Sequence, residues 1–126
     1  MGAHSIGESD ELELARKLLA NLRSAISQVA DREYQKRVWL GNLPDERSSF
    51  IEVYYLIVES DIDVVRANRA ALDVSTTEWE LMLRFLVRFL AYYSGVNDVY
   101  AQELILWDPE WAVVVRAAGD VLAARA

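Results

Sequence analysis

The chain has 126 residues, which fits one domain, and 53% of them are hydrophobic, which excludes an intrinsically disordered protein. It contains no cysteine, so disulfides, thiolate metal sites and cysteine nucleophiles are excluded. The net charge of -7 opposes contact with phosphate backbones, so direct nucleic-acid binding is not expected, and a basic protein partner is favoured instead.

The N-terminal segment, residues 1–9, consists mostly of small and polar residues. We expect it to form a flexible tail before a single helical domain of residues 10–126. The segment lacks the cationic and apolar regions of a signal peptide, and no apolar run in the chain is long enough to span a bilayer. We therefore expect a cytoplasmic protein with no membrane contact.

A helix is predicted to begin at Asp10, where Glu13 completes a capping box, and to reach about Val38. Apolar residues then recur at alternating spacings of three and four and form one stripe. We expect this stripe to pack on the rest of the chain, although it could also be a contact between subunits. Its members are Leu12, Ala15, Leu19, Leu22, Ile26 and Val29.

The clearest break in the chain is residues 41–49, which combine glycine, asparagine, proline and two serines. Ser49 and Glu52 then form the capping box of a second helix. Residues 50–59 are rich in valine, isoleucine and tyrosine, so a buried strand, and with it an α+β fold, is the alternative. The cap and the absence of polar–apolar alternation favour the helix, which we expect to bend at Ser60 and Asp61.

Ser75 and Glu78 form the strongest capping box in the chain and open a helix that ends at Gly95. A shorter helix is predicted to start at Asn97 or Asp98 and to end near Leu106. Asp108 as N-cap and Pro109 at the first helical position then open the last helix, which runs to about Ala123. The predicted fold is therefore all-α, with about five helices packed in a compact bundle.

Arg84 and Arg88 stand one turn apart in the otherwise apolar segment of residues 81–93. The favoured interpretation is that they mark the solvated edge of a mostly buried helix. They could instead pair with Glu52 and Glu59 on the preceding helix, which we expect to run antiparallel. The third interpretation is an anion or small-molecule site beside the two arginines, but no glycine-rich phosphate loop accompanies them.

The sequence offers few residues for catalysis. Its single histidine, His4, lies in the expected tail, so neither a histidine-based triad nor a histidine metal site can be assembled. The acidic turn with Glu59, Asp61 and Asp63 lacks the remainder of a calcium loop. We therefore predict a non-enzymatic protein without a metal or a cofactor.

Trp39, Leu40 and Gly41 form a W-x-G tripeptide between two predicted helices, and this resembles the turn of a family of small secreted helical hairpins named for that pattern. The resemblance covers these three residues alone. The following segment is more apolar than the second helix of such a hairpin, and the chain continues well past its end. We therefore interpret Trp39 as packing at a helix end, with Gly41 as a helix C-cap.

Tryptophan set among acidic residues is typical of an interface anchor, because it offers apolar area inside a charged rim. We therefore predict a small acidic inhibitor, immunity-type protein or adaptor that binds a basic protein. A homo-oligomeric structural protein, including a homodimer, is the alternative, and a small-molecule or anion binder is another. The predicted partner-binding residues are Trp107, Trp111, Asp98, Glu103, Asp108 and Glu110.

Overall fold

The computed structural model describes the backbone of residues 2–41 and 49–125 and the side chains of residues 10–41 and 49–125. The described residues contain helices and no strand, so the all-α prediction is confirmed and residues 50–59 belong to a helix and its end. The elements in chain order are α1 (Gly2–Ala30), α2 (Arg32–Tyr34), the π-helical turn η1 (Gln35–Trp39), α3 (Phe50–Val58), α4 (Ile62–Ala67), α5 (Thr76–Gly95), α6 (Gln102–Leu106) and α7 (Pro109–Arg125).

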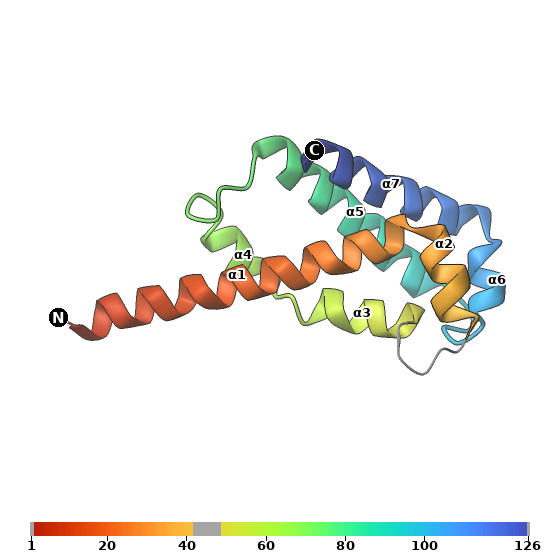
Figure 1. The fold of residues 1–126 in the computed structure, drawn as a ribbon, viewed down its shortest axis with the longest axis horizontal. Helices are drawn as coiled ribbons and strands as arrows, with labels where there is room; N and C mark the ends of the chain where they lie inside the picture. The colour runs from red at the N-terminus through yellow and green to blue at the C-terminus, as the bar shows by residue number, and fades with distance from the viewer. Residues whose placement is uncertain (1, 42–48, 126) are drawn as a thin grey trace.

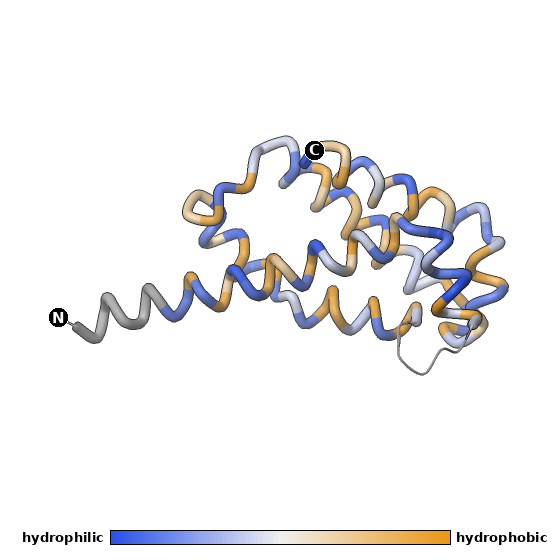
Figure 2. Tube along the Cα trace, viewed as in Figure 1, coloured by the Kyte–Doolittle hydropathy of each residue, from blue (hydrophilic) through white to orange (hydrophobic). Residues whose placement is uncertain are grey.

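Four of these helices surround one core. α1 packs against α7 and α3, and α5 packs against α7 on the other side, while α4 rests on α1 (Figure 1). The N-terminal part of α1 extends beyond the other helices, and α6 and α2 lie at the opposite end of the molecule (Figure 1). Hydrophobic and hydrophilic residues alternate along α3, α5 and α7 (Figure 2), as expected of helices that bury one face.

The apolar stripe of α1 is buried inside the bundle from Ala15 onward, and Leu12 is partly buried. Ala15, Leu22, Ile26 and Val29 have no exposed area, so the stripe packs on this chain and does not form a seam for a second one. The helix begins at Gly2, not at Asp10. No proline interrupts residues 2–9, and extending an existing helix costs far less than nucleating one.

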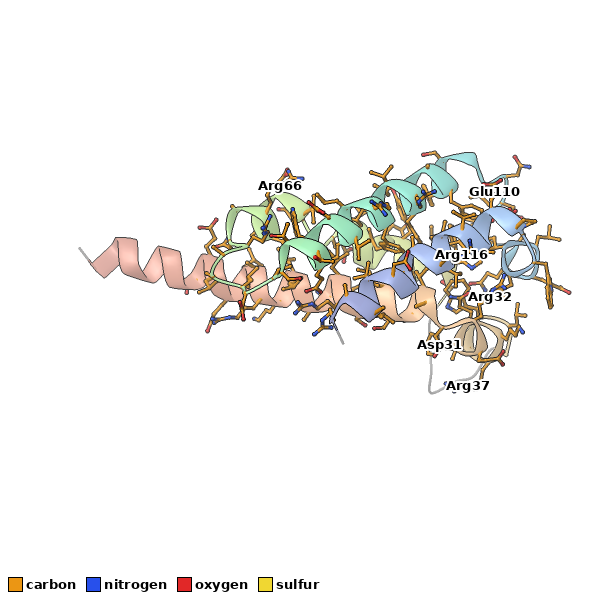
Figure 3. All side chains as sticks on the ribbon, turned by 90° about the horizontal axis from the view of Figure 1, so that it is seen from above. Asp31, Arg32, Arg37, Arg66, Glu110 and Arg116 are labelled. Carbon is orange, nitrogen blue, oxygen red and sulfur yellow. The ribbon has the colours of Figure 1, made fainter. Side chains whose placement is uncertain are left out.

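α1 ends at Ala30, so the prediction that it continues to about Val38 was wrong. Asp31 is extended (φ -108°, ψ 92°), and its carboxylate accepts a hydrogen bond from the Tyr34 amide, which caps α2 (Figure 3). The buried Gln35 side chain donates to the carbonyls of Gln28 and Val29 at 2.8 and 2.7 Å. Two carbonyls in the last turn of α1 thus accept hydrogen bonds from a side chain of the next turn.

The predicted caps of the later helices are confirmed. The Ser49 hydroxyl accepts from the Glu52 amide, and the Ser75 hydroxyl accepts from the Glu78 amide. The chain bends at Asp61, which is left-handed with φ 43°. Residues 42–48 of the predicted break, including Pro44, lie outside the part of the chain that the structure describes.

An aromatic cluster joins α3, α5 and α7 with η1. Phe50 stacks on Phe89 with ring centroids 5.6 Å apart and meets the edge of Trp111 at 5.5 Å. Trp39 contacts both Phe50 and Trp111, and it is 5% exposed, as its interpretation as a packed helix end requires. These rings pack together at the end of the bundle where α6 lies.

Ion pairs to the buried Glu78 carboxylate join α1, the start of α5 and the end of α7. The carboxylate of Glu78 receives two hydrogen bonds from Arg23, at 2.8 and 3.0 Å, and its Oε2 lies 3.4 Å from Arg125 Nε. The Glu78 side chain is only 5% exposed. In a capping box this side chain would return to the Ser75 amide, but here it connects three helices.

A candidate protein-binding surface around α6

α6 is a short helix whose position is fixed by hydrogen bonds from both sides. Gln102 donates to the Trp39 carbonyl at 3.0 Å and accepts from the Phe50 amide at 2.8 Å. Arg32 donates to the Leu106 carbonyl at 3.1 Å, and Ile105 and Leu106 are buried against the core. The opposite side of α6 therefore faces the solvent.

Three large apolar side chains project from this region into solvent. Tyr100 is 76% exposed, Leu104 is 74% exposed and Trp107 is 70% exposed. Asp98, Glu103 and Glu110 are exposed around them, and Asp108 is partly exposed. We call this set the α6 surface: Asp98, Tyr100, Glu103, Leu104, Trp107, Asp108 and Glu110.

The α6 surface borders two hollows. One, of about 360 Å³, lies between Leu40, Tyr100 in the turn before α6, and Leu104 of α6. The other, of about 200 Å³, lies between the end of α5 and α6 and has Asp98 and Asp108 in its lining. Both are open to solvent, so a partner could insert a side chain beside the exposed apolar residues.

Trp111 is not part of this surface. Its side chain is fully buried, and its indole N–H donates to Gln35 Oε1 at 3.1 Å. Trp111 faces inward, as do the other buried residues of α7: Val114, Ala117, Ala118 and Val121. The expectation that Trp111 contacts a partner is therefore corrected, and Trp107 is the exposed tryptophan of the pair.

Trp107 is oriented by a basic side chain. Lys36 Nζ lies 5.5 Å from the centroid of the Trp107 ring, within the range of a cation–π contact. Lys36 belongs to η1, so this contact also ties η1 to the residue that follows α6. The tryptophan side chain is therefore restrained while most of its area stays in solvent, which lowers the entropy lost when it binds.

Asp108 connects the start of α7 to α5. Its Oδ1 accepts from the Glu110 amide at 2.9 Å, which confirms it as the cap of α7. Its Oδ2 accepts from the Tyr92 hydroxyl, also at 2.9 Å. Burial raises the pKa of Tyr92 above its ordinary value of 10.0, and the hydrogen bond and the charges of Asp108 and Glu110 raise that pKa further.

This shift predicts how stability falls in alkaline solution. The folded state holds the Tyr92 proton where the unfolded state has already lost its own, so this contribution is complete below pH 10.0 and declines as pH rises further. We expect Tyr92→Phe to make the loss of stability between about pH 9 and pH 11.5 less steep. Urea unfolding at a series of pH values measures this, and the exposed Tyr100→Phe is the control. Equal slopes in wild type and Tyr92→Phe would contradict it.

Arg84 and Arg88 are both exposed, as are Glu52 and Glu59. Among the described residues, no ion pair joins either arginine to either glutamate. The solvated-edge interpretation of the arginines thus agrees with their exposure, whereas the internal network does not form. Arg88 lines a hollow of about 360 Å³, but Asp108 and Glu110 line it too, and these acids oppose an anion there.

The described part of the chain contains neither a candidate metal site nor a membrane-spanning helix. No group of three or more histidine or acidic side chains there lies close enough to hold a metal ion. No helix in the same residues combines the length and the apolar content of a membrane span. His4 lies outside the residues whose side chains are described.

Sequence reasoning missed Tyr100 and Leu104 as members of the α6 surface. A signal was present, because Leu104 is followed directly by the apolar pair Ile105 and Leu106, and a helix cannot bury three successive residues on one face. The predicted start of the helix at Asn97 or Asp98 obscured it. α6 begins at Gln102, and Asp98 instead accepts a hydrogen bond from the Tyr100 amide in a turn.

Comparisons of the chain with models of protein families, with curated proteins and with solved structures found no match.

Proposed function

We propose that the protein is a non-enzymatic binding module, a small acidic inhibitor, immunity-type protein or adaptor, and that it binds a basic protein through the α6 surface. The observation that carries the proposal is the exposure of Tyr100, Leu104 and Trp107 within a few residues of four carboxylates. Large apolar side chains of this kind cost solubility when exposed and gain free energy when a partner covers them.

The α6 surface has the composition of a binding site with a distinct centre and rim. Tyrosine and tryptophan dominate binding energy in many interfaces, because they bury a large area and keep a polar tip. Asp98, Glu103 and Glu110 would surround them and face cationic side chains of the partner. The acidic rim would speed encounter and set orientation, while the apolar centre would limit dissociation.

The inhibitor form of the proposal follows from charge. Twelve acidic and six basic residues follow Ser48, so the excess negative charge lies in the part of the chain that contains the α6 surface. An acidic surface can cover the basic active site of a toxin or a nuclease by placing carboxylates where the phosphates of the substrate bind. Such a protein needs no catalytic group of its own.

The test is affinity capture of the tagged protein from lysate of its host at low and high salt, with variants run in parallel. We expect one stoichiometric basic partner that high salt removes. With that partner purified, its association rate should fall as ionic strength rises, and Trp107→Ala should weaken affinity about tenfold or more. Glu103→Lys should mainly slow association.

Matched controls lie at the far end of α1, away from α6 (Figure 1). Leu14 is exposed and apolar, and Glu11 is exposed and acidic, so Leu14→Ala and Glu11→Lys test the same chemical changes elsewhere. An affinity that Trp107→Ala leaves unchanged would contradict a site at α6. So would an equal loss of affinity in the α1 control variants. Association with a captured partner at a rate independent of salt would contradict charge steering.

A further inference from the structure

The seam between α5 and α7 contains a hollow at the end of the molecule where α6 lies. The two helices lie side by side and are antiparallel, because Arg125 near the end of α7 pairs with Glu78 at the start of α5 (Figure 1). At the other end of the seam, the last turns of α5 and the first turns of α7 line a hollow of about 360 Å³. A volume of this size can hold a small organic molecule.

The walls of this hollow are partly apolar. Val114 is buried, Val96 is partly buried and Val113 is 39% exposed, and all three line it. Gly95 lines it as well, and a Cβ atom added there would have no packing neighbour within 4 Å. The lack of a side chain at Gly95 therefore leaves the space beside α5 open to a ligand.

Opposite charges line the hollow from two helices. Arg88 lines it from α5, whereas Asp108 and Glu110 line it from the cap and the first turn of α7, where Figure 3 labels Glu110. Among the residues that the structure describes, no ion pair joins Arg88 to either carboxylate. The Asp108 carboxylate is instead oriented by the Tyr92 hydroxyl and the Glu110 amide, each at 2.9 Å. Both signs of charge are therefore available to a molecule in the hollow.

This pattern of charge favours a ligand that carries both signs. An anion would be repelled by Asp108 and Glu110, and a cation without an acidic group would be repelled by Arg88. A carboxylate can accept two parallel hydrogen bonds from a guanidinium group, and an ammonium group can donate up to three hydrogen bonds. A zwitterion makes both kinds of contact at once, and its apolar part can pack against the valines of the hollow.

The geometry points to a binding site for a free α-amino acid with an apolar side chain, held between the end of α5 and the start of α7. Arg88 binds the carboxylate of the ligand, and Asp108 and Glu110 accept hydrogen bonds from its ammonium group. The side chain of the ligand occupies the space beside Gly95 and packs on Val96. This site is independent of the proposed protein partner, because the ligand is a small molecule and the purified chain alone is sufficient to bind it.

Calorimetric titration of the purified protein with L-valine, L-leucine and L-phenylalanine tests the proposal. We expect saturable binding of one molecule per chain by at least one of the three. Two analogues of the tightest ligand separate its charges, because the amide lacks the carboxylate and the N-acetyl derivative lacks the ammonium group. Each analogue should bind about tenfold more weakly, since it loses charge-assisted hydrogen bonds. The absence of saturable binding by all three amino acids, or an amide that binds as tightly as its amino acid, would overturn the proposal.

Replacement of a charged residue should affect only those ligands that carry the group it binds. Arg88→Gln should lower the affinity for the amino acid about tenfold and should not weaken binding of the amide, which has no carboxylate. Glu110→Gln should weaken binding of the amino acid and of the amide, but not of the N-acetyl derivative. Arg84→Gln and Glu80→Gln are the matched controls, because both residues are exposed on α5 and neither lines the hollow. Controls that weaken binding as much as Arg88→Gln would contradict the assigned site.

Gly95→Leu tests the position of the ligand by filling the hollow. Gly95 does not have a positive φ, and a Cβ atom there has open space around it, so the fold should accept the leucine. The variant should abolish binding of the amino acid, while circular dichroism verifies that it is folded. Gly119→Leu in α7 is the matched control, because a Cβ atom at Gly119 also has open space and Gly119 does not line the hollow. An affinity of the wild-type value in folded Gly95→Leu would overturn the proposal.

Discussion

Trp111→Ala is expected to lower the free energy of unfolding by about 3–5 kcal/mol, because it empties the centre of the aromatic cluster. Trp111 is fully buried and contacts Trp39, Phe50, Phe89 and Tyr92 through its ring. The substitution also leaves Gln35 Oε1 without the indole donor that it now has at 3.1 Å. Urea unfolding followed by circular dichroism measures the loss.

Trp107→Ala provides the matched control, because the two tryptophans are four positions apart in the sequence and opposite in burial. Trp107 is 70% exposed, so its replacement should change the free energy of unfolding by about 0.5 kcal/mol or less. The proposed function predicts the reverse order for partner binding. Equal destabilisation by the two substitutions would show that Trp107 packs as a core residue, contrary to its described position.

The acidic neighbours of the two tryptophans do not indicate which of the two is buried. Helical phase separates them, because Trp111, Val114, Ala118 and Val121 recur at spacings of three and four and so share one face of α7. Trp107 precedes the Asp108 cap and lies outside that phase. Helical phase therefore identifies Trp111 as the buried tryptophan, whereas acidic neighbours are common to both.

The starts of helices with serine caps were predictable, because the chemistry of a cap is local. Ser49 and Ser75 each accept the amide of the residue three positions on, as the capping-box pattern predicts. The end of α1 was not predictable in this way. It depends on the extended backbone at Asp31 and on Gln35, whose side chain donates to the end of α1 and accepts from the Trp111 indole of α7.

The two arginines of α5 show where sequence reasoning on a candidate site stops. Their exposure follows from helical phase, since Phe85, Leu86 and Phe89 occupy the buried side. The predicted antiparallel course of the preceding helix is also found. What could not be predicted is the surroundings of Arg88, which lines a hollow with Asp108 and Glu110 at the start of α7 and with no residue of α3.

Arg23→Met is expected to lower the free energy of unfolding by about 3 kcal/mol, because it leaves the Glu78 carboxylate buried without its bidentate partner. Glu78 is 4% exposed, and Arg125, at 3.4 Å from Oε2, offers a single longer contact in compensation. Methionine keeps most of the apolar stem of arginine, so the loss reports the missing charge and hydrogen bonds and not a cavity. Urea unfolding at neutral pH is the measurement.

Removal of the Glu78 carboxylate should lower the free energy of unfolding by less than removal of Arg23. This asymmetry distinguishes a buried carboxylate from an ion pair on the surface. In Glu78→Leu, the Arg23 and Arg125 side chains, 24% and 43% exposed, can turn their charged groups into water, so we expect a loss of about 1 kcal/mol. Arg23→Met combined with Glu78→Leu should recover most of the stability that Arg23→Met loses, since no buried charge remains unpaired. The exposed pair Arg66–Asp63 is the control, and Arg66→Met should cost less than about 1 kcal/mol. If Arg23→Met costs no more than Arg66→Met, then solvent reaches Glu78 and the three-helix ion pair does not stabilise the fold.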